Sequence, residues 1–564
     1  MKGIDNIGVW SEVSKLNTVI VNKNMLAHNY VLPEHIEQYI KLREYLKIHL
    51  GLNETEFKTA KLQIGDKIVP LGDDALKLRW TNKENKEVFK NLRQRSVLDF
   101  FISNPSYILF DDIIYGESIE EEFSDFLKVL DTVATTLDIS ELIEDGLKIM
   151  VDDDKLAETF FKRLIAISTN ENEKSKAKEL CASYKRLDTN TLLHILITGR
   201  SEEGDVYFHP LPNLLFTRDI AAVIGDVIVG AAAAKPARRR EALLSWLVFS
   251  SHPSFKETRF IDMLGIQIEK CIANNHCPFI SIEGGDLVVL DDQTILAGLS
   301  ERTSFAGILE YARERWFPSA NGNRNASFKN DSFKRLLAIQ ISEERSSMHL
   351  DTVFTIADQL AGTSLSAMCF EPFDDISKKS LKTYEITPEW IEESGFLNKE
   401  IYTENDIENY KEQTFISHGA STLHEICSYN TNYNIEMLHC GGSRQVPDNI
   451  ANNSNISHSV DSELLYQKRE QWTDGANLLA LAPGVVITYE RNIETLNELR
   501  SAGFEVMNPA QFAGNYDSII DYNKKQPDSP KRVVIKIPGG ELSRGRGGPR
   551  CMSLPIARSG SKRS

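Results

Sequence analysis

The sequence predicts a mixed α/β protein that carries an additional helical subdomain. From residue 209 onward, short apolar runs typical of strands alternate with runs typical of helices, which is the pattern of α/β domains. Residues 117–200 contain few glycines and prolines, and their apolar residues recur three and four positions apart, as at Phe123, Phe126, Leu127 and Leu130. The 564 residues are enough for two or more structural units.

The individual elements follow from apolar runs and their borders. Leu16–Asn22 is a predicted strand, and Tyr107–Phe110 is predicted to be a buried strand that ends at Asp111 and Asp112. The later alternation of strands and helices includes, in order, Val223–Val229, Ala242–Phe249, Phe279–Ile282 and Leu287–Leu290. Near the C-terminus we predict a strand over Leu478–Thr488, a short helix over Leu496–Ala502 and a last strand over Val533–Ile537.

Composition and charge exclude several classes of function. Hydrophobic residues make up 41% of the chain and charged residues 26%, which is typical of a soluble globular protein. The net charge of −17 disfavours nucleic acid and anionic membranes as partners and suits a small cationic substrate. No apolar run reaches the length of about 18 residues that a membrane-spanning helix needs.

The seven cysteines indicate a reducing compartment. Their number is odd and they form no CxxC pair, which argues against a disulfide framework and against a zinc ribbon. The first residues, Met1–Asn6, lack the apolar core of a signal peptide. We therefore expect a cytoplasmic protein.

A glycine-rich loop, Gly539–Ser553, places Cys551 among arginines. Glycines let the backbone approach a ligand closely, and neighbouring arginines favour the thiolate, which is the nucleophilic form of cysteine. Two other interpretations stay open for this loop alone, namely a buried unreactive cysteine and an RNA-binding segment rich in Arg and Gly. The GxxxxGK[ST] spacing of a phosphate-binding loop is absent.

His349 and Asp351 form a second candidate site. Histidine is the natural general acid and base near neutral pH, and in an extended segment residues two apart point to the same side. The pair could move protons and bind a cation, could be structural, or could hold a divalent metal ion. Carboxylates also occur in Glu283–Asp286 and Asn213–Asp219, although each of these segments alone is more typical of a turn or a loop.

Together, these segments contain the groups that a guanidinium site requires. A guanidinium is planar with five N–H donors, and two carboxylates recognise it in bidentate geometry. Breaking one of its C–N bonds takes a soft nucleophile and a proton donor for ammonia, and arginines recognise an amino-acid carboxylate. The combination therefore favours an enzyme that acts on a guanidinium.

The ordered series of motifs resembles the bacterial-type arginine deiminases of the guanidine-modifying superfamily. The motifs follow one another in the family's order over most of the chain. They are Ser11–Val19, Leu109–Ile113, Pro210–Asp219, Ala237–Glu241, Glu283–Asp286, Leu299–Thr303, His349–Thr352, Arg469–Gly475 and the Cys551 loop.

The resemblance implies hydrolysis of free L-arginine to L-citrulline and ammonia through a covalent thiouronium, with no metal and no cofactor. Cys551 would attack the guanidinium carbon. His349 would protonate the departing ammonia and then activate water, while Glu283 would orient His349. Asp219 and Asp351 would clamp the guanidinium nitrogens.

The resemblance also implies a set of substrate-binding residues. Arg238, Arg302 and Arg546 would bind the carboxylate of the substrate, and Asn213 and Phe216 would line the pocket. We expect L-arginine as the small-molecule substrate, no nucleic-acid or membrane partner, and a homo-oligomer.

The fold implied by the resemblance is a five-bladed α/β propeller (pentein) of ββαβ units with an inserted α-helical domain. Residues 1–116 would form its N-terminal part, with an inserted segment at about 25–106. Residues 117–200 would be the helical subdomain, and 201–557 the main catalytic propeller, with insertions at about 371–412 and 444–467. Residues 558–564 would be a disordered tail.

Three alternatives remain beside this hypothesis. Another guanidine, such as agmatine, a methylated arginine or a protein-bound arginine, could be the substrate, although three arginines for a carboxylate favour the free amino acid. A non-catalytic arginine-binding protein would not need Cys551, His349 and the carboxylates together. A metal hydrolase using His349 would be sensitive to chelators.

Overall fold

The computed structural model describes most of the chain, and the remainder includes Asp111, Asp112 and most of the insertions expected at about 25–106 and 444–467. The predicted strand at Tyr107–Phe110 also lies outside the described residues, apart from Leu109. The described residues are 7–24, 26–29, 61–64, 67–70, 109, 116–202, 205–272, 278–318, 331–342, 347–358, 364–366, 382–416, 436–442, 466–526 and 529–560.

Five small sheets in the described part of the chain share one strand pattern. Each contains an antiparallel pair of strands, and the second strand of the pair also pairs in parallel with a third. Two sheets consist of β19 (Leu554–Arg558), β1 (Leu16–Val21) and β4 (Thr135–Asp138), and of β5 (Ala221–Ile224), β6 (Val227–Gly230) and β7 (Arg259–Asp262). The next two consist of β8 (Leu287–Val289), β9 (Thr294–Leu299) and β10 (Arg335–Gln340), with β13 (Thr383–Ile386) at the edge, and of β11 (Phe354–Ile356), β12 (Ser364–Ser366) and β14 (Met437–His439). The fifth consists of β15 (Leu479–Ala482), β16 (Val485–Tyr489) and β18 (Val533–Ile537), with β17 (Glu505–Met507) at the edge.

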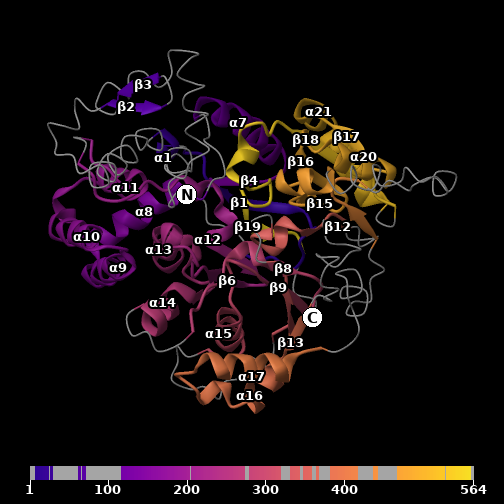
Figure 1. Cartoon of the computed structure of the whole chain (residues 1–564). Helices are drawn as coiled ribbons and strands as arrows, with labels where there is room; N and C mark the ends of the chain where they lie inside the picture. The colour runs from indigo at the N-terminus through magenta and orange to yellow at the C-terminus, as the bar shows by residue number, and fades with distance from the viewer. Residues whose placement is uncertain are drawn as a thin grey trace.

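Helices connect the strands that run parallel, as such crossovers require. The connecting helices are α7 (Gly116–Val133) between β1 and β4, α13 (Pro236–Ser251) between β6 and β7, α15 (Phe305–Trp316) between β9 and β10, α16 (Pro388–Glu393) and α17 (Glu404–Thr414) between β12 and β14, and α20 (Ile493–Ser501) and α21 (Pro509–Lys525) between β16 and β18. Figure 1 shows α7 and α21 along the top of the molecule, with β1, β4 and β19 near its middle. The predicted α/β class is confirmed.

Two of the apolar runs that predict a single strand each form two strands in the structure. Val223–Val229 spans β5 and β6, because Gly225 turns the chain at φ 64°. Leu478–Thr488 likewise spans β15 and β16, with Gly484 at φ 70° between them. Ala242–Phe249 lies within α13, and Phe279–Ile282 forms no strand, since only Ile282 makes an isolated bridge to Ala232.

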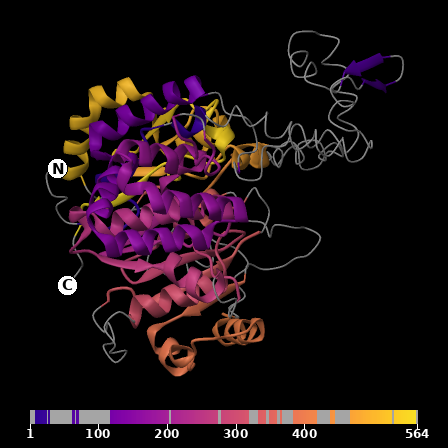
Figure 2. The same cartoon turned by 90° about the vertical axis from the view of Figure 1, so that its left-hand side faces the viewer.

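A group of four helices forms much of the segment predicted to be helical. They are α8 (Ile139–Asp152), α9 (Asp154–Ile167), α10 (Glu171–Ser183) and α11 (Thr189–Thr198). Their apolar faces share a core with α13, which includes Leu147, Phe160 and Leu247. Figure 2 shows these helices in front of the sheets. The first part of the predicted segment instead belongs to the sheets, because β4 pairs with β1 and α7 packs on α21 and β18.

The prediction of a disordered tail from residue 558 places its start too early, because Arg558 is the last residue of β19. Its buried guanidinium donates from Nη1 to the Ser14 carbonyl at 2.6 Å and from Nη2 to the Ala480 carbonyl at 2.8 Å. These bonds and the pairing with β1 fix residue 558. No helix in the described part of the chain combines the length and the apolar character needed to cross a membrane.

Candidate active site

The predicted catalytic residues lie in the turns that lead into the first strands of four sheets. Asp219 lies in α12 (Thr217–Ile220) directly before β5, and Glu283 precedes the 3₁₀ turn η5 (Gly284–Asp286) and β8. His349 precedes the 3₁₀ turn η8 (Leu350–Thr352) and β11, and Cys551 lies shortly before β19. Equivalent turns of neighbouring sheets therefore supply the side chains. The extended segment that would point His349 and Asp351 to the same side is not formed, because Leu350–Thr352 is a 3₁₀ turn.

His349 lies between two buried carboxylates. Its Nε2 is 2.8 Å from Glu283 Oε2, and its Nδ1 is 3.7 Å from Asp219 Oδ1. Burial opposes the imidazolium, but Asp219, Glu283 and the nearby Asp286 outweigh it and raise the pKa of His349. Although burial also opposes the Glu283 carboxylate, its bond to His349 and the charge of Arg302 lower the pKa of Glu283. The pair is therefore imidazolium and carboxylate at neutral pH, and His349 holds a proton that it can donate.

Gly285 allows this close arrangement. A Cβ at position 285 would lie 2.8 Å from Asp219 Oδ1 and 2.9 Å from His349 Cγ. Only glycine leaves the room for these two side chains to meet. The glycines of Glu283–Asp286 thus serve packing as well as the turn.

The Cys551 thiol is buried between an amide and a carboxylate. Its Sγ lies 3.2 Å from the side-chain nitrogen of Asn477 and 3.8 Å from each carboxylate oxygen of Asp351. The backbone N–H groups of Cys551 and Arg550 donate to Asn477 Oδ1, each at 3.0 Å. Asn477 also donates to the Asp351 carbonyl at 3.0 Å, so it ties the Cys551 loop to the turn that carries Asp351.

The thiol is not activated in the way that its sequence neighbours suggest. Burial, followed by the charges of Asp351, Asp219 and Asp474, raises the pKa of Cys551, and Arg550 offsets this only in part. The expectation that adjacent arginines stabilise a thiolate is therefore wrong for this state of the site. The charges of these three carboxylates act on the sulfur, and together with burial they favour a protonated thiol in the absence of a cationic substrate.

Arg238 is fully engaged by protein groups. Its Nη1 donates to Asp219 Oδ2, its Nε donates to Glu241 Oε2 at 2.7 Å, and its Nη2 donates to the carbonyls of Asn213 and Phe216 at 3.0 and 3.1 Å. These partners hold Asp219 in place. Such a guanidinium is suited to orienting Asp219 rather than to binding the substrate carboxylate, which is the role that the resemblance implies.

We expect Arg238→Met to lower the free energy of unfolding by about 3 kcal/mol or more, because it leaves Asp219 and Glu241 buried without their cation. Urea denaturation of the variant and the wild type measures this difference. Lys174→Met is a suitable control, since Lys174 pairs with the 88%-exposed Glu171 and should contribute less than about 1 kcal/mol. Equal losses in the two variants would contradict this account of Arg238.

The other predicted substrate residues border the same region. Arg302 lies 3.8 Å from Glu283 through Nη1 and donates from Nη2 to Met348 Sδ at 3.4 Å. Arg546 packs its guanidinium 4.0 Å from the ring centre of Trp472 and donates to the Trp472 carbonyl. Phe216 packs so close to Gly547 that a Cβ there would meet its ring at 2.3 Å. Together with the buried Asn213, these residues come from the loops around the catalytic turns.

Four residues of the site have no role in the sequence-based prediction. The resemblance assigns no role to Arg550, yet its Nη1 donates to Asp351 Oδ2 at 2.7 Å. Asp286 accepts from Ser300 Oγ at 2.7 Å and from the Leu350 backbone N–H at 2.8 Å, which links the two turns. Asn477 follows the Arg469–Gly475 motif, and Glu12 lies in the first motif. Their positions within or beside motifs are the signal that could have identified them.

A cluster of Asp219, Glu283 and His349 has the geometry of a metal site, with one ligand atom of each within 4.8 Å of the others. A metal requires a ring nitrogen with a free lone pair. Both nitrogens of His349 instead face carboxylates, whose charges raise the pKa of His349 in the metal-free site. In this state the three residues form an ionic network.

Comparison with known proteins shows similarity to the arginine deiminases. The family model described as "Arginine deiminase" matches residues 106–380 and 454–558. The arginine deiminase of Listeria monocytogenes serotype 4b is 30% identical over 478 residues, covering 80% of this chain and 91% of the relative. The arginine deiminase of Bacillus cereus is 29% identical over 476 residues, covering 80% and 92%.

Solved structures give weaker similarities. An amidinotransferase from Microseira wollei covers 99% of both chains at 11% sequence identity and a TM-score of 0.41. The N-terminal domain of a cyanobacterial arginine dihydrolase, bound to product, covers 62% of this chain and 78% of its own at 12% identity and a TM-score of 0.28.

Proposed function

Because the chain belongs to the arginine deiminase family, we propose that it hydrolyses free L-arginine to L-citrulline and ammonia through a covalent intermediate on Cys551. The observation that carries this proposal is a pair of buried carboxylates beside a buried thiol. Asp351 lies 3.8 Å from Sγ, and Oδ1 of Asp219 accepts no hydrogen bond from the described residues. Arg238 and Arg550 each occupy one oxygen of these two carboxylates. The other oxygen of each carboxylate can therefore accept the matching N–H donors of a bound guanidinium.

In the first half of the reaction, the Cys551 thiol releases its proton to solvent when the cationic substrate binds. The thiolate then attacks the guanidinium carbon, and a tetrahedral adduct forms. His349 gives its proton to one terminal nitrogen, the C–N bond breaks, and ammonia leaves a thiouronium on Cys551. In the second half, His349 takes a proton from water and the resulting hydroxide adds to the carbon. The C–S bond then breaks while the hydroxyl proton of the adduct passes to the departing sulfur, which releases neutral citrulline and restores the thiol. Asp219 and Asp351 hold the carbon near the sulfur throughout.

The substrate itself activates the thiol in this proposal. The carboxylates of Asp351 and Asp219 are major causes of the raised pKa of Cys551, after burial. A guanidinium bound between them cancels their charge at the sulfur and lowers the thiol pKa. The nucleophile is then formed when a cationic substrate occupies the site.

We assign the substrate carboxylate to Arg302 and Arg546, and the orientation of Asp219 to Arg238. Arg546→Ala should raise KM for arginine by about tenfold or more, because it removes a charge-assisted hydrogen bond. Agmatine lacks the carboxylate, so its KM should change by less than about twofold on the same reasoning. Arg544→Ala is the control, since its half-exposed guanidinium pairs with Glu541 in the same loop. If Arg546→Ala raised KM equally for arginine and agmatine, Arg546 would not be the residue that binds the substrate carboxylate.

The five sheets with one repeated strand pattern support a further part of the proposal, the five-bladed α/β propeller implied by the resemblance. Each of the five first strands follows a turn that carries a residue of the site: Asp219, Glu283, His349, Asn477 and Cys551. In a propeller these turns would gather around one axis. That arrangement would explain why residues so distant in sequence share one site.

A citrulline assay on the purified full chain tests the function. L-Arginine, agmatine and a methylated arginine are supplied side by side, with and without a chelator. We expect citrulline from arginine at the highest kcat/KM, with no effect of the chelator. Preference for agmatine or the methylated arginine would contradict the assigned substrate, and loss of activity with the chelator would favour a metal hydrolase.

A further inference from the structure

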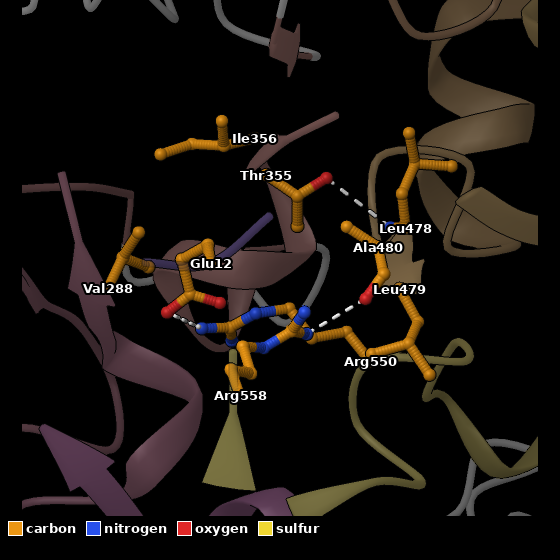
Figure 3. Close-up of a pocket in the computed structure, with 9 residues that line it drawn as sticks. All are labelled: Glu12, Val288, Thr355, Ile356, Leu478, Leu479, Ala480, Arg550 and Arg558. Carbon is orange, nitrogen blue, oxygen red and sulfur yellow. Dashed lines mark hydrogen bonds and ion pairs between the residues drawn. The ribbon is translucent and has the colours of Figure 1, made fainter. Parts of the chain in front are cut away.

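Glu12 is a buried carboxylate that no step of the proposed reaction uses. It lies in the segment before β1 and is 8% exposed. Its Oε1 accepts from Arg550 Nη2 at 3.2 Å and from the Val289 backbone N–H at 3.3 Å. Together with Arg550 and Arg558 it lines a cavity of about 10 Å³, and Figure 3 shows the two guanidiniums beside the Glu12 carboxylate. Glu12 and Arg550 thus form a buried ion pair next to the groups that take part in the proposed reaction.

Arg550 connects Glu12 to the guanidinium clamp. Its Nη2 donates to Glu12 and to the Leu287 carbonyl at 3.0 Å, while its Nη1 donates to Asp351 Oδ2 at 2.7 Å. Asp351 in turn lies 3.8 Å from Cys551 Sγ. A planar guanidinium held by several acceptors cannot rotate, so it fixes the Asp351 carboxylate at one position.

The charges around Glu12 give it a second effect. Arg550, Arg218 and Arg558 lower the pKa of Glu12 to about 2 against burial, which raises it. Nε and Nη2 of the buried Arg218 have no hydrogen-bond partner in the described part of the chain. If Glu12 lost its charge, Asp351 would face these arginines with one carboxylate fewer, and its attraction for a cationic substrate would fall.

We propose that Glu12 is a positioning residue for the guanidinium clamp, acting through Arg550 on Asp351 and Cys551. Its carboxylate fixes Arg550, and its charge offsets the arginines so that Asp351 keeps its pull on the substrate. The predicted effect on KM rests on the proposed function. The predicted effect on the Cys551 thiol does not.

Glu12→Gln tests the proposal, because the amide keeps an oxygen that can accept from Arg550 and removes only the charge. We expect KM for arginine to rise by about tenfold, with kcat changed by less than about threefold. In the free enzyme, the removed negative charge should lower the thiol pKa. The midpoint of the Cys551 alkylation profile should therefore move to lower pH by about one unit, which is about tenfold more thiolate.

The alkylation rate is measured with iodoacetamide from about pH 7 to about pH 11.5, so that the profile extends past the raised midpoint. Mass spectrometry of the Cys551 peptide in the full chain gives the rate. Greater exposure of the thiol would raise the rate at every pH, whereas a lower pKa moves the midpoint. The charged groups with the largest influence on the pKa of Cys551 are Asp351, Asp219, Asp474 and Arg550. None of these is altered in the variant.

Two further variants complete the test. Glu12→Asp keeps the charge and should return the midpoint toward the wild-type value. Glu310→Gln removes another buried carboxylate, which pairs with Lys270 at 2.7 Å away from the site, and should leave KM and midpoint unchanged. The proposal would be overturned if the midpoint of the alkylation profile were unchanged in Glu12→Gln. It would also be overturned if the midpoint in Glu12→Asp were no closer to the wild-type value than the midpoint in Glu12→Gln. If wild type releases no citrulline, the function fails but the midpoint still decides the role of Glu12.

Discussion

Cys551→Ala is expected to abolish citrulline formation, with kcat reduced by about 10⁴-fold or more, as for other covalent nucleophiles. The sulfur is the soft nucleophile among the described groups that face the carboxylate clamp, and alanine leaves no atom to form the covalent bond. Removing a small buried side chain should leave the fold intact, which circular dichroism and thermal unfolding can check. Mass spectrometry of the wild type, quenched during turnover, should show the thiouronium that the variant lacks.

Cys271→Ala is the matched control for this prediction. Cys271 is also buried, and its sulfur accepts from the Ile280 backbone N–H at 3.4 Å in a different part of the core. Its loss should affect stability slightly and citrulline formation not at all. Near-wild-type turnover in Cys551→Ala would show that the thiol is not the nucleophile.

Asp219→Asn is expected to lower kcat/KM for arginine by about a thousandfold, or about 4 kcal/mol. The carboxylate accepts from Arg238 on one oxygen and faces His349 with the other. An amide must turn its NH₂ group either toward Arg238 or toward the substrate, and in both cases donor meets donor. The substitution therefore weakens the clamp whichever way the amide is oriented.

The pH dependence gives a second measurement on the same variant. Burial opposes the His349 imidazolium, and the Asp219 charge is the largest influence that raises its pKa. Without that charge the pKa of His349 falls, so the proton donor is lost at a lower pH. The alkaline limb of kcat should move to lower pH in Asp219→Asn.

Asp262→Asn controls for the loss of an arginine-paired aspartate elsewhere. Asp262 is the last residue of β7, and its carboxylate pairs with the Arg163 guanidinium at 2.5 Å. Asp262→Asn should keep the wild-type kcat/KM and the wild-type alkaline limb of the pH profile of kcat. A similar loss of activity in both variants, or an unmoved limb in Asp219→Asn, would contradict the role of Asp219.

The sequence could predict the elements and the motif residues because both depend on local pattern. The strands at Leu16–Val21 and Val533–Ile537 follow from β-branched runs, and both occur in the structure. The motif order identifies the family because the chemistry of a guanidinium restricts which side chains can serve it. Cys551, His349 and the carboxylates are brought together by turns that occupy equivalent places in separate sheets.

The remaining features depend on contacts between distant segments. Arg238 and Arg550 look alike in the sequence, and only packing shows that one holds Asp219 and the other holds Asp351. The raised pKa of the Cys551 thiol depends on such contacts too. Arginines adjacent in sequence to Cys551 matter less than carboxylates brought from other turns, since electrostatic effects follow distance in space.

The protonated state of the buried Cys551 thiol also has a consequence for chemical damage. Peroxides react with thiolates far faster than with thiols, so a site that keeps its sulfur protonated resists conversion to the sulfenic acid. The empty enzyme should therefore survive oxidants that inactivate a preformed thiolate. Vulnerability would appear during turnover, when a bound cation ionises the sulfur, and the bound substrate itself would then cover it.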